Sequence, residues 1–316
     1  MLGIGHGRAP VSMIRCLVFL FLAMRLHADD VMEKYFKQVP DKSEMRTIAQ
    51  VDFIYMINLD ERPEKFRAAR QVLGPHGICP CRFSAVNGWR LDFKALEELG
   101  VIYAPGMPEG PLSSVYRQEE GQEYMGFEIM KEPGIAYYCH SLSRGAIGCI
   151  LSHLSVLQDA YDSGYETIWV MEDDIRVASS PHEISSLIST LDQIAPGWDV
   201  FFTDFETKSS SGQCVYNTWI RPRPLVHQEP LAYYQERTYL NGDFMKIGLR
   251  FGAYSMILRR EGIRKILAYY KKSKLFFPYD MEFCYAPEIK MYQCARDIVT
   301  TISGALSDNA APAYSR

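Results

Sequence analysis

The stretch that decides the fold is Tyr165-Glu166-Thr167-Ile168-Trp169-Val170-Met171-Glu172-Asp173-Asp174, in which an apolar run ends abruptly in three carboxylates. The apolar run is typical of a buried strand, and the carboxylates follow at its carboxyl end. Ligands of open α/β sheets bind outside the carboxyl ends of the strands. The stretch therefore predicts a sheet with an acidic binding site at one edge.

Three crowded carboxylates repel one another unless positive charge lies among them. A divalent cation with oxygen ligands, Mg²⁺ or Mn²⁺, is the natural partner, and it usually shares its coordination with a substrate phosphate. The acidic motif therefore predicts a metal-dependent site for a phosphorylated ligand. The alternative is an acidic turn that only meets water, and the motif alone does not separate the two.

Composition narrows the class of protein. The chain has 316 residues, 47% of them hydrophobic, which is enough for one large domain or two small ones. The formal net charge is −4 and no basic stripe occurs, which excludes general nucleic-acid binding. The eight cysteines are scattered, with no paired CxxC motifs, so neither a dense disulfide framework nor a zinc-finger site is predicted.

The first 28 residues form a separate piece. Arg8 and Arg15 precede a short apolar run over 16–24, a pattern that resembles a secretory signal peptide. The run is too short for a comfortable membrane span, although an uncleaved anchor is an alternative. We therefore predict export or membrane association through the N-terminus, with a cytoplasmic, membrane-proximal location as the alternative. Residues 29–50 are predicted to be a linker.

Two strand–helix steps precede the acidic strand and favour a parallel α/β sheet. The first strand, 51–58, leads into a helix that begins near Pro63, and the second strand covers 81–86. The long stretch 100–143 is rich in Gly, Pro and Glu and predicts a flexible insertion near the site. Later elements follow from the same patterns: a helix over 181–194, strands at 198–204, 251–258 and 297–302, and a helix over 260–271.

The helix before the acidic strand is predicted to begin after Ser143 as its cap, with Ile147, Ile150 and Leu154 on its buried face. Gly145 and Gly148 in its first turns let a ligand or the neighbouring sheet approach closely, and free backbone N–H groups there favour an anion.

Four polar residues near the predicted site have two interpretations. Asn58 and Asn87 end strands, where each either contacts a ligand or belongs to a turn, and for Asn87-Gly88 the pattern favours the turn. Ser152 and His153 face away from the apolar stripe of their helix. His153 contacts a nucleotide or satisfies a nearby backbone group, and the pattern alone favours the backbone group.

Several of these motifs, in this order, resemble glycosyltransferase family 25, which includes lipopolysaccharide-biosynthesis and collagen galactosyltransferases. The resemblance covers roughly residues 51–308, and its two middle motifs are together specific. The motifs are Ile57-Asn58-Leu59-Asp60 with Arg62 and Arg67, then 82–88, 145–154, Glu172-Asp173-Asp174, Trp198-Asp199, Gly252-Ala253-Tyr254 and Pro278-Tyr279-Asp280.

The resemblance implies a GT-A-like, Rossmann-type α/β fold with a mainly parallel sheet flanked by helices. It implies a glycosyltransferase domain over 51–308, with a nucleotide-binding part at about 51–180, an acceptor-binding part at about 181–308, and a flexible tail at 309–316. The implied reaction moves a hexose, most often galactose, from a UDP-sugar to a glycan or protein-linked acceptor, with inversion at the anomeric carbon.

The resemblance also implies roles for residues. Asp174, with Glu172, would hold Mn²⁺ or Mg²⁺ on the donor diphosphate, and Ser307-Asp308 or water would complete the shell. Inversion needs a base on the acceptor side, for which Asp280 is the first candidate, followed by Glu282 and Asp204. The residues implied in nucleotide-sugar binding are Asn58, Asp60, Arg62, Asn87, Ser152, His153, Glu172 and Asp173.

Two alternatives stay open at this point. A strand ending in Glu-Asp-Asp also begins receiver domains, but there the motif closes the first strand, and no later strand here offers the expected Lys. The second alternative is a non-catalytic carbohydrate-binding or surface protein that retains the fold. The intact acidic triplet favours the enzyme, whereas the export-like leader favours the binding protein, because nucleotide sugars are not expected outside the cell.

Overall fold

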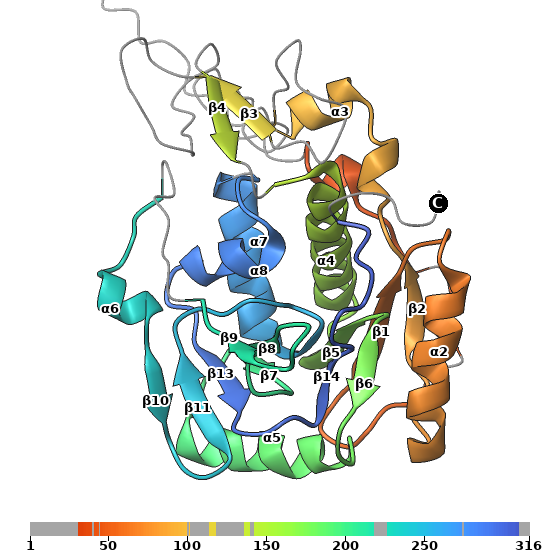
Figure 1. The fold of residues 1–316 in the computed structure, drawn as a ribbon, viewed down its shortest axis with the longest axis vertical. Coiled ribbons are helices and arrows are strands. Elements are labelled where there is room, and N and C mark those ends of the chain that lie inside the picture. Colours follow the sequence, from red (N-terminus) through yellow and green to blue (C-terminus); the bar gives the residue numbers. More distant parts are fainter. Residues whose placement is uncertain are drawn as a thin grey trace, which may run out of the picture.

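An eight-stranded sheet forms the centre of the computed structural model, and helices cover both of its faces (Figure 1). The structure describes residues 31–39, 41–43, 45–99, 101, 114–117, 136–139, 142–217, 226–273 and 275–309. The predicted α/β class with a helix-flanked sheet is confirmed. The strands lie in the order β10 (Arg237–Tyr239), β11 (Phe244–Ile247), β13 (Met291–Cys294), β7 (Val200–Phe202), β12 (Ser255–Arg259), β5 (Thr167–Glu172), β1 (Phe53–Asn58) and β2 (Cys81–Ser84).

The sheet is mixed. Strands β2, β1 and β5 are parallel neighbours, as are β7 and β13, whereas the other pairings are antiparallel. The expectation of a mainly parallel sheet therefore applies to the β2–β1–β5 part. Strand β12 runs the other way because the chain enters it at the acidic edge, where the Glu172 N–H donates to the Tyr254 carbonyl at 2.9 Å.

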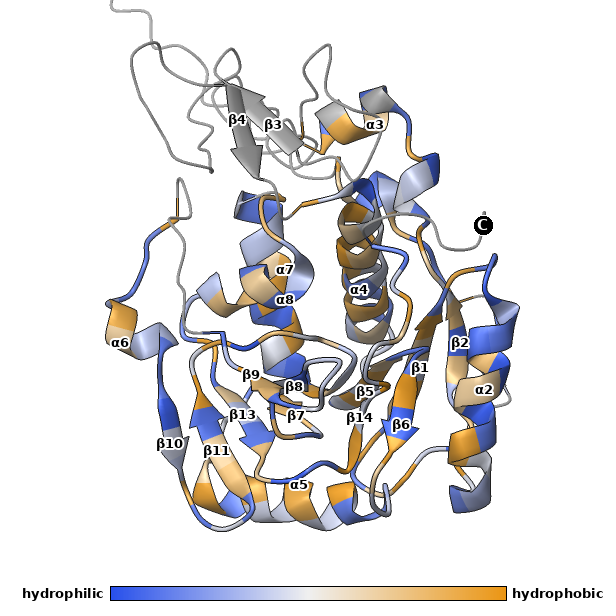
Figure 2. Ribbon diagram, viewed as in Figure 1, coloured by the Kyte–Doolittle hydropathy of each residue, from blue (hydrophilic) through white to orange (hydrophobic). Residues whose placement is uncertain are grey.

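Alternating side chains of the central strands pack on two separate apolar cores, as the period of a strand requires. Phe53, Tyr55 and Ile57 face the core under α4 (Arg144–Asp162) and α7 (Arg260–Ser273). Ile54 and Met56 face the opposite core, under α2 (Pro63–Leu73) and α5 (Glu183–Ile194). Figure 2 shows that β1 and much of α4 consist mainly of hydrophobic residues, in agreement with this burial.

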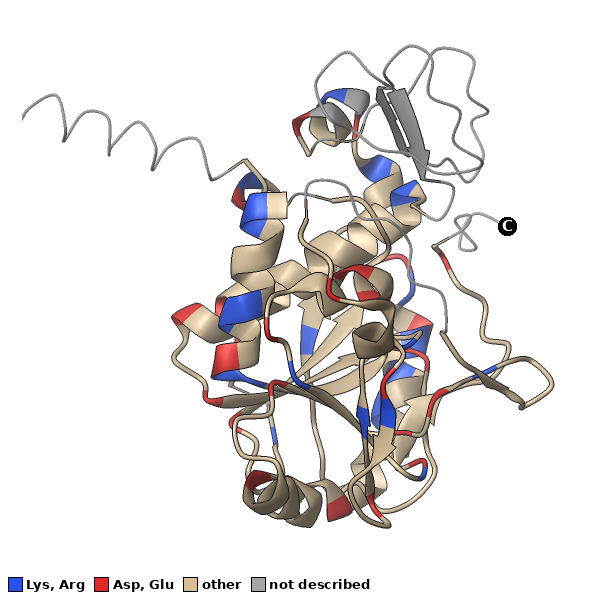
Figure 3. Cartoon of the chain, turned by 90° about the vertical axis from the view of Figure 1, so that its left-hand side faces the viewer, with Lys and Arg blue, Asp and Glu red and all other residues tan. Residues whose placement is uncertain are grey.

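The remaining elements are short. They are α3 (Phe93–Glu98), α6 (Leu231–Tyr234), α8 (Tyr279–Glu282), the 3-10 turns η1 (Glu33–Tyr35), η2 (Gly74–His76), η3 (Gly88–Arg90) and η4 (Phe283–Tyr285), and the strand pairs β3 (Ser114–Arg117) with β4 (Ala136–Cys139), β6 (Ile175–Val177) with β14 (Val299–Thr301), and β8 (Thr207–Lys208) with β9 (Cys214–Val215). Basic and acidic positions are interspersed over the described elements in the view of Figure 3.

Most elements that the sequence predicts are present. The structure confirms α2, α4, α5 and α7, the strands β1, β2, β5, β7, β12 and β14, and Ser143 as the cap of α4, its hydroxyl accepting the Ala146 N–H at 3.0 Å. Sequence analysis missed the short strands β10, β11 and β13 at one side of the sheet.

The segment predicted to be a linker lies against the domain in its described part. Met32 and Ile48 are buried, and Lys42 donates to the Asp159 carboxylate at 2.7 Å. Residues 1–28 and the tail from 310 lie outside the described residues, as does most of the insertion at 100–143. In the part of the chain that the structure describes, no helix is long and apolar enough to cross a membrane.

The first turns of α4 touch the backbone that follows β2. A Cβ atom at Gly148 would lie 2.4 Å from the Gly88 nitrogen, and one at Gly88 would lie 1.8 Å from the Arg144 carbonyl oxygen. Gly145 is equally close to the C-terminal segment, since its Cβ would lie 2.5 Å from the Asn309 carbonyl oxygen. The predicted close approach at these glycines is therefore made by the protein's own backbone.

We expect Gly148→Ala to lower the free energy of unfolding by about 1–3 kcal/mol, because backbone atoms have to move to admit the methyl group. The intrinsic helix propensity of Ala acts in the opposite direction by about 1 kcal/mol. The matched control is Gly74→Ala, at a position where no atom lies within 4 Å of the added Cβ. Urea denaturation followed by circular dichroism measures both variants, and equal stability of the two would refute the close contact.

Candidate functional site

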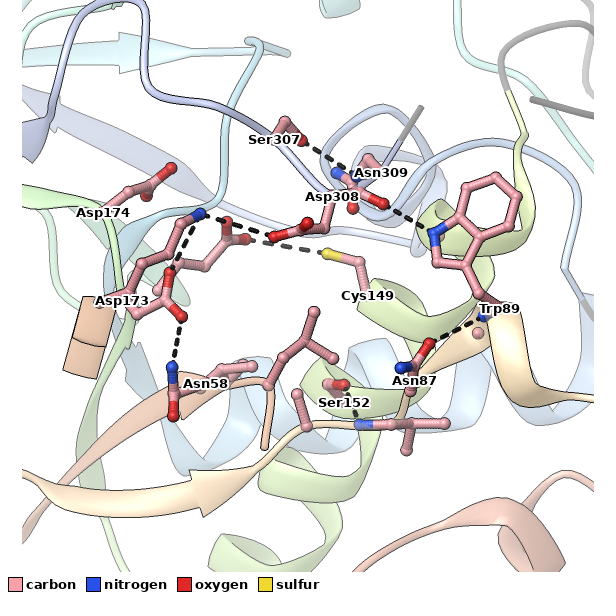
Figure 4. Close-up of a pocket in the computed structure, with 18 residues that line it drawn as sticks. Asn58, Asn87, Trp89, Cys149, Ser152, Asp173, Asp174, Ser307, Asp308 and Asn309 are labelled. Atoms are coloured by element: carbon pink, nitrogen blue, oxygen red, sulfur yellow. Dashed lines mark hydrogen bonds and ion pairs between the residues drawn. The ribbon is translucent and has the colours of Figure 1, made fainter. Parts of the chain in front are cut away.

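A cleft with an acidic floor opens at the carboxyl ends of β1 and β5, beside the first turns of α4 (Figure 4). We call it the acidic cleft. The C-terminal segment 307–309 closes one side of it. Its polar and aromatic lining residues are Asn58, Lys65, Asn87, Trp89, Cys149, Ser152, Glu172, Asp173, Asp174, Ser307, Asp308 and Asn309.

The three carboxylates of the acidic motif have different surroundings. Asp173 accepts a hydrogen bond from Asn58 Nδ2 at 2.7 Å, and its other oxygen lies 3.8 Å from Lys65 Nζ. Glu172 Oε1 lies 3.0 Å from His153 Nε2. Asp174 Oδ1 is buried and has no hydrogen-bond partner among the described residues. The last carboxylate of the motif is therefore the one left for a ligand.

The charge of the motif is not fully balanced by the protein. Burial first, and then the charges of Glu172 and Asp173, raise the pKa of Asp174 to about 7. Burial also raises the pKa of Asp173, against the hydrogen bond from Asn58 and the charge of Lys65. An unpaired buried carboxylate oxygen among like charges matches the oxygen ligands that Mg²⁺ and Mn²⁺ prefer. The residues present thus fit a hard divalent cation at Asp174.

Asp308 brings a fourth carboxylate to the acidic cleft. Both of its oxygens lie 3.0 Å from Arg62 Nη1, and one lies 3.8 Å from Lys65 Nζ. Its carbonyl oxygen accepts the indole N–H of Trp89 at 2.7 Å, and Ser143 Oγ donates to the next carbonyl, that of Asn309. These contacts hold the C-terminal segment across the start of α4, as expected if Ser307-Asp308 faces the site.

Three of the six residues predicted to contact the nucleotide outside the acidic motif line the acidic cleft: Asn58, Asn87 and Ser152. Each also has a structural partner. Asn58 is bound by Arg82 Nε at 2.7 Å, Asn87 accepts the Trp89 N–H at 3.0 Å, and Ser152 Oγ accepts the Val86 N–H at 2.8 Å. The turn interpretation of Asn87 is therefore correct, although its side chain still faces the cleft.

The other three do not line the acidic cleft. Asp60 pairs with Arg82 at 2.7 Å on an exposed surface, and Arg62 acts through Asp308. His153 is fully buried, with its ring stacked 4.3 Å from that of Tyr279. Its Nε2 atom is directed at the Glu172 carboxylate and not at a backbone group.

A second hollow adjoins the acidic cleft. We call it the side pocket, and Asp280, Tyr254 and Gly252 lie on its far wall. The two hollows share Cys149, Glu172 and Asn309 as lining residues. Asp280 Oδ2 accepts the Gly252 N–H at 2.6 Å, and burial raises the pKa of its carboxyl. Asp280 thus lines the side pocket, Asp174 lines the acidic cleft, and Glu172 lines both.

Glu282 and Asp204, the other residues predicted as the base, line neither hollow. Glu282 is fully buried, accepting from the Tyr269 hydroxyl at 2.6 Å and the Phe277 N–H at 2.7 Å. Asp204 is fully buried in an ion pair with Arg250 at 3.0 Å. Both carboxylates hold the fold together, so we do not carry them forward as candidates for the base.

Four polar or aromatic lining residues had no role in the sequence analysis: Lys65, Trp89, Cys149 and Asn309. Lys65 is a weak signal because surface helices commonly carry lysines. Trp89 directly follows the Asn87-Gly88 turn, and Cys149 belongs to the same glycine-containing helix start as Gly145 and Gly148. Their positions next to predicted site residues were the only signals available.

Comparisons with known proteins show which family model and which proteins the chain is similar to. The family model described as "Glycosyltransferase family 25 (LPS biosynthesis protein)" matches residues 51–283. The chain is similar to a Drosophila melanogaster protein named "Glycosyltransferase 25 family member", with 29% identity over 143 residues, 45% of this chain and 18% of that protein.

Two human proteins are also similar to this chain. "Procollagen galactosyltransferase 2" is 28% identical over 152 residues, 48% of this chain and 20% of that protein. "Inactive glycosyltransferase 25 family member 3" is 24% identical over 152 residues, 48% of this chain and 21% of that protein. The matched stretch makes up about a fifth of the length of these relatives.

The raised pKa of Asp174 predicts a pH-dependent stability in metal-free buffer. The folded protein retains a proton that the unfolded chain has lost between about pH 4 and pH 7, so the free energy of unfolding falls as pH rises through this window. Because Asp174→Asn cannot ionise, we expect it to be more stable than wild type at pH 8, by on the order of 1–3 kcal/mol.

Urea denaturation at pH 5 and pH 8 in the presence of a chelator measures this effect. The stability difference between Asp174→Asn and wild type should widen from pH 5 to pH 8. The control is Asp162→Asn, an exposed carboxyl at the last residue of α4, for which the difference should stay constant. A constant difference for Asp174→Asn as well would show that this carboxyl is not under electrostatic strain.

Proposed function

The chain belongs to glycosyltransferase family 25, and from this premise we propose that it transfers a hexose, galactose first among the candidates, from a UDP-sugar to a glycan or protein-linked acceptor. We propose that the transfer requires Mn²⁺ or Mg²⁺ and inverts the anomeric carbon. The observation that carries the proposal is the buried, unpartnered Asp174 oxygen in the acidic cleft.

The acidic cleft is the proposed donor site. It lies outside the carboxyl ends of the parallel strands β1 and β5, where nucleotides bind in open α/β sheets. Asp174, with Asp308 and Glu172 near it, would hold the cation, which would supply Lewis-acid stabilisation of the leaving diphosphate. Lys65 adds the positive charge that a diphosphate needs, and its Nζ atom lies 3.8 Å from both Asp173 and Asp308.

Asn58 is proposed as the residue that orients the acidic motif for this role. Its side-chain nitrogen donates to Asp173 at 2.7 Å and to the Arg62 carbonyl at 2.8 Å, while its oxygen accepts from Arg82. Its side-chain nitrogen thus joins the turn after β1 to the turn after β5, while its oxygen is held by Arg82 on β2. Holding these two turns together keeps the cleft open at a fixed width, and preorganised sites of this kind avoid reorganisation during the reaction.

The side pocket is the proposed acceptor site, with Asp280 as the general base. Inversion needs a base that takes a proton from the acceptor hydroxyl on the face opposite to the leaving diphosphate. Asp280 meets this requirement because the side pocket and the acidic cleft join at Glu172. Burial raises the pKa of Asp280, which makes its carboxylate a stronger base than an exposed one.

A non-catalytic carbohydrate-binding protein is the second candidate, because one relative bears the name "Inactive glycosyltransferase 25 family member 3". The state of Asp174 favours the enzyme. A buried polar atom without a partner is costly, and a protein that needs no cation gains nothing from retaining it. The acceptor class, and export or membrane association through residues 1–28, are proposed on the sequence alone.

Titration calorimetry with UDP-galactose and UDP-glucose, with and without Mn²⁺, tests the donor site. We expect binding that requires Mn²⁺, with UDP-galactose the tighter ligand. Asp174→Ala should weaken it by at least about tenfold through loss of a metal ligand, whereas Asp162→Ala should bind like wild type. Binding of neither donor under either condition would favour the non-catalytic candidate.

Asp280→Asn tests the base. An amide can still accept the Gly252 N–H, so the fold and donor affinity should be retained, while kcat for transfer should fall by about 10²–10⁴-fold. Calorimetry of donor binding is the internal control. A variant that retains more than half of the wild-type kcat would remove Asp280 from the mechanism.

A further inference from the structure

Cys149, His153 and Glu172 form a cluster that the proposed transfer reaction does not use as a unit. Among the residues that the structure describes, they are the one set of three potential metal ligands whose donor atoms all lie within 4.8 Å of one another. The cysteine and the histidine are one helical turn apart on α4, so both project from the same face. Glu172 meets them from the end of β5.

We propose that Cys149 Sγ, His153 Nε2 and a Glu172 carboxylate oxygen bind a soft divalent cation, Zn²⁺, at a site that shares Glu172 with the hard-cation site but does not include Asp174. A cation here would have three protein ligands. Its fourth position would face the junction of the two hollows, because Cys149 and Glu172 line both of them.

The distances fit a tetrahedral zinc ion after small movements. At zinc bond lengths, tetrahedral nitrogen, oxygen and sulfur ligands lie roughly 3.3–3.7 Å from one another. The observed separations are 3.0 Å between His153 Nε2 and Glu172 Oε1, and 3.8 Å between Cys149 Sγ and the same oxygen. These two values bracket the required range, and all three donor atoms lie within 4.8 Å of one another, so small movements of the side chains would admit the ion.

His153 is held in the orientation that such a site needs. Its ring is fully buried and stacked on Tyr279 with an interplanar angle of 12°, which fixes the direction of Nε2. Its other nitrogen, Nδ1, has no partner among the described residues. The imidazole is therefore not committed to the fold through hydrogen bonds other than the one to Glu172, and a cation would replace that bond.

The ligand types decide the kind of ion. Thiolate and imidazole select zinc and similar ions, whereas Mg²⁺ and Mn²⁺ prefer carboxylate, carbonyl and water oxygens. Asp174 is surrounded by oxygen ligands and the Cys149 cluster contains sulfur and nitrogen, so the two sites separate ions by chemistry. Binding at the cluster releases the thiol proton to solvent, since the thiolate is the ligand.

The consequence for the reaction rests on the proposed function. Zinc at the cluster would take Glu172 from the donor site and place positive charge between donor and acceptor. We therefore expect Zn²⁺ to inhibit transfer that is supported by Mn²⁺, through a site that does not include Asp174.

Cobalt reports the site directly, independently of activity. Titration of Co²⁺ into the full-length protein, with cysteines kept reduced, should produce a near-ultraviolet sulfur-to-cobalt charge-transfer band that Zn²⁺ abolishes. Cys149→Ser should lack the band. Glu172→Gln retains the thiol, and its affinity for Co²⁺ should be at least about tenfold weaker. The matched control is Cys79→Ser, a free cysteine outside both hollows, which should give the wild-type spectrum.

Absence of the band from wild type, its persistence in Cys149→Ser, or its loss in Cys79→Ser would each overturn the proposal. Circular dichroism shows whether each variant is folded, and Glu172→Gln decides the matter if Cys149→Ser is not. The ratio of transfer rates with and without Zn²⁺ is then compared within each variant. If the wild type has no transferase activity, only the proposed function is contradicted, because the cobalt spectra test the zinc site without any measurement of activity.

Discussion

Repulsion between carboxylates at the end of β5 is the constraint on which the rest of the site depends. Three consecutive acidic residues end a strand that is buried on both faces, so water cannot screen all of them. The protein balances each in a different way. Asp173 accepts a hydrogen bond from Asn58 and lies near Lys65, Glu172 lies beside His153, and Asp174 Oδ1 has no hydrogen-bond partner among the described residues. The uncompensated negative charge is therefore concentrated on Asp174, where a cation would bind.

The balance requires α4 to lie very close to the sheet edge. Gly88 and Gly148 allow the turn after β2 and the first turns of α4 to meet at backbone distance, and Gly145 does the same for the C-terminal segment. In this arrangement His153 lies within reach of Glu172, and the C-terminal segment 307–309 lies beside the acidic cleft. The glycines thus influence the site by allowing these segments to pack closely.

The sequence predicts those parts of the fold whose signals are local. Apolar periodicity and caps located α4 and β5, and a run of carboxylates at a strand end located the cleft. Partners distant in the chain gave no such signal. Asp204 looks like a strand-end carboxylate in the sequence, but Arg250 pairs with it, and Glu282 looks like a turn carboxylate, but the Tyr269 hydroxyl donates a hydrogen bond to it. The sequence analysis missed the short strands β10, β11 and β13 for a related reason. Pairing with strands distant in the chain, more than their own residues, makes them strands.

Glu172 is the side chain at which these arguments meet, and its position limits what it can do. It lines both hollows and is bound by His153, so it cannot serve fully as a ligand of the cation at Asp174 without giving up that contact. A carboxylate bound to a buried imidazole places negative charge where the acidic cleft adjoins the side pocket that Asp280 lines. The same contact makes it a ready third ligand for a soft ion, because the histidine and the cysteine are already in place on one helix. The contacts of Glu172 with His153 and Cys149 on α4 therefore determine how much negative charge lies at the junction of the two hollows.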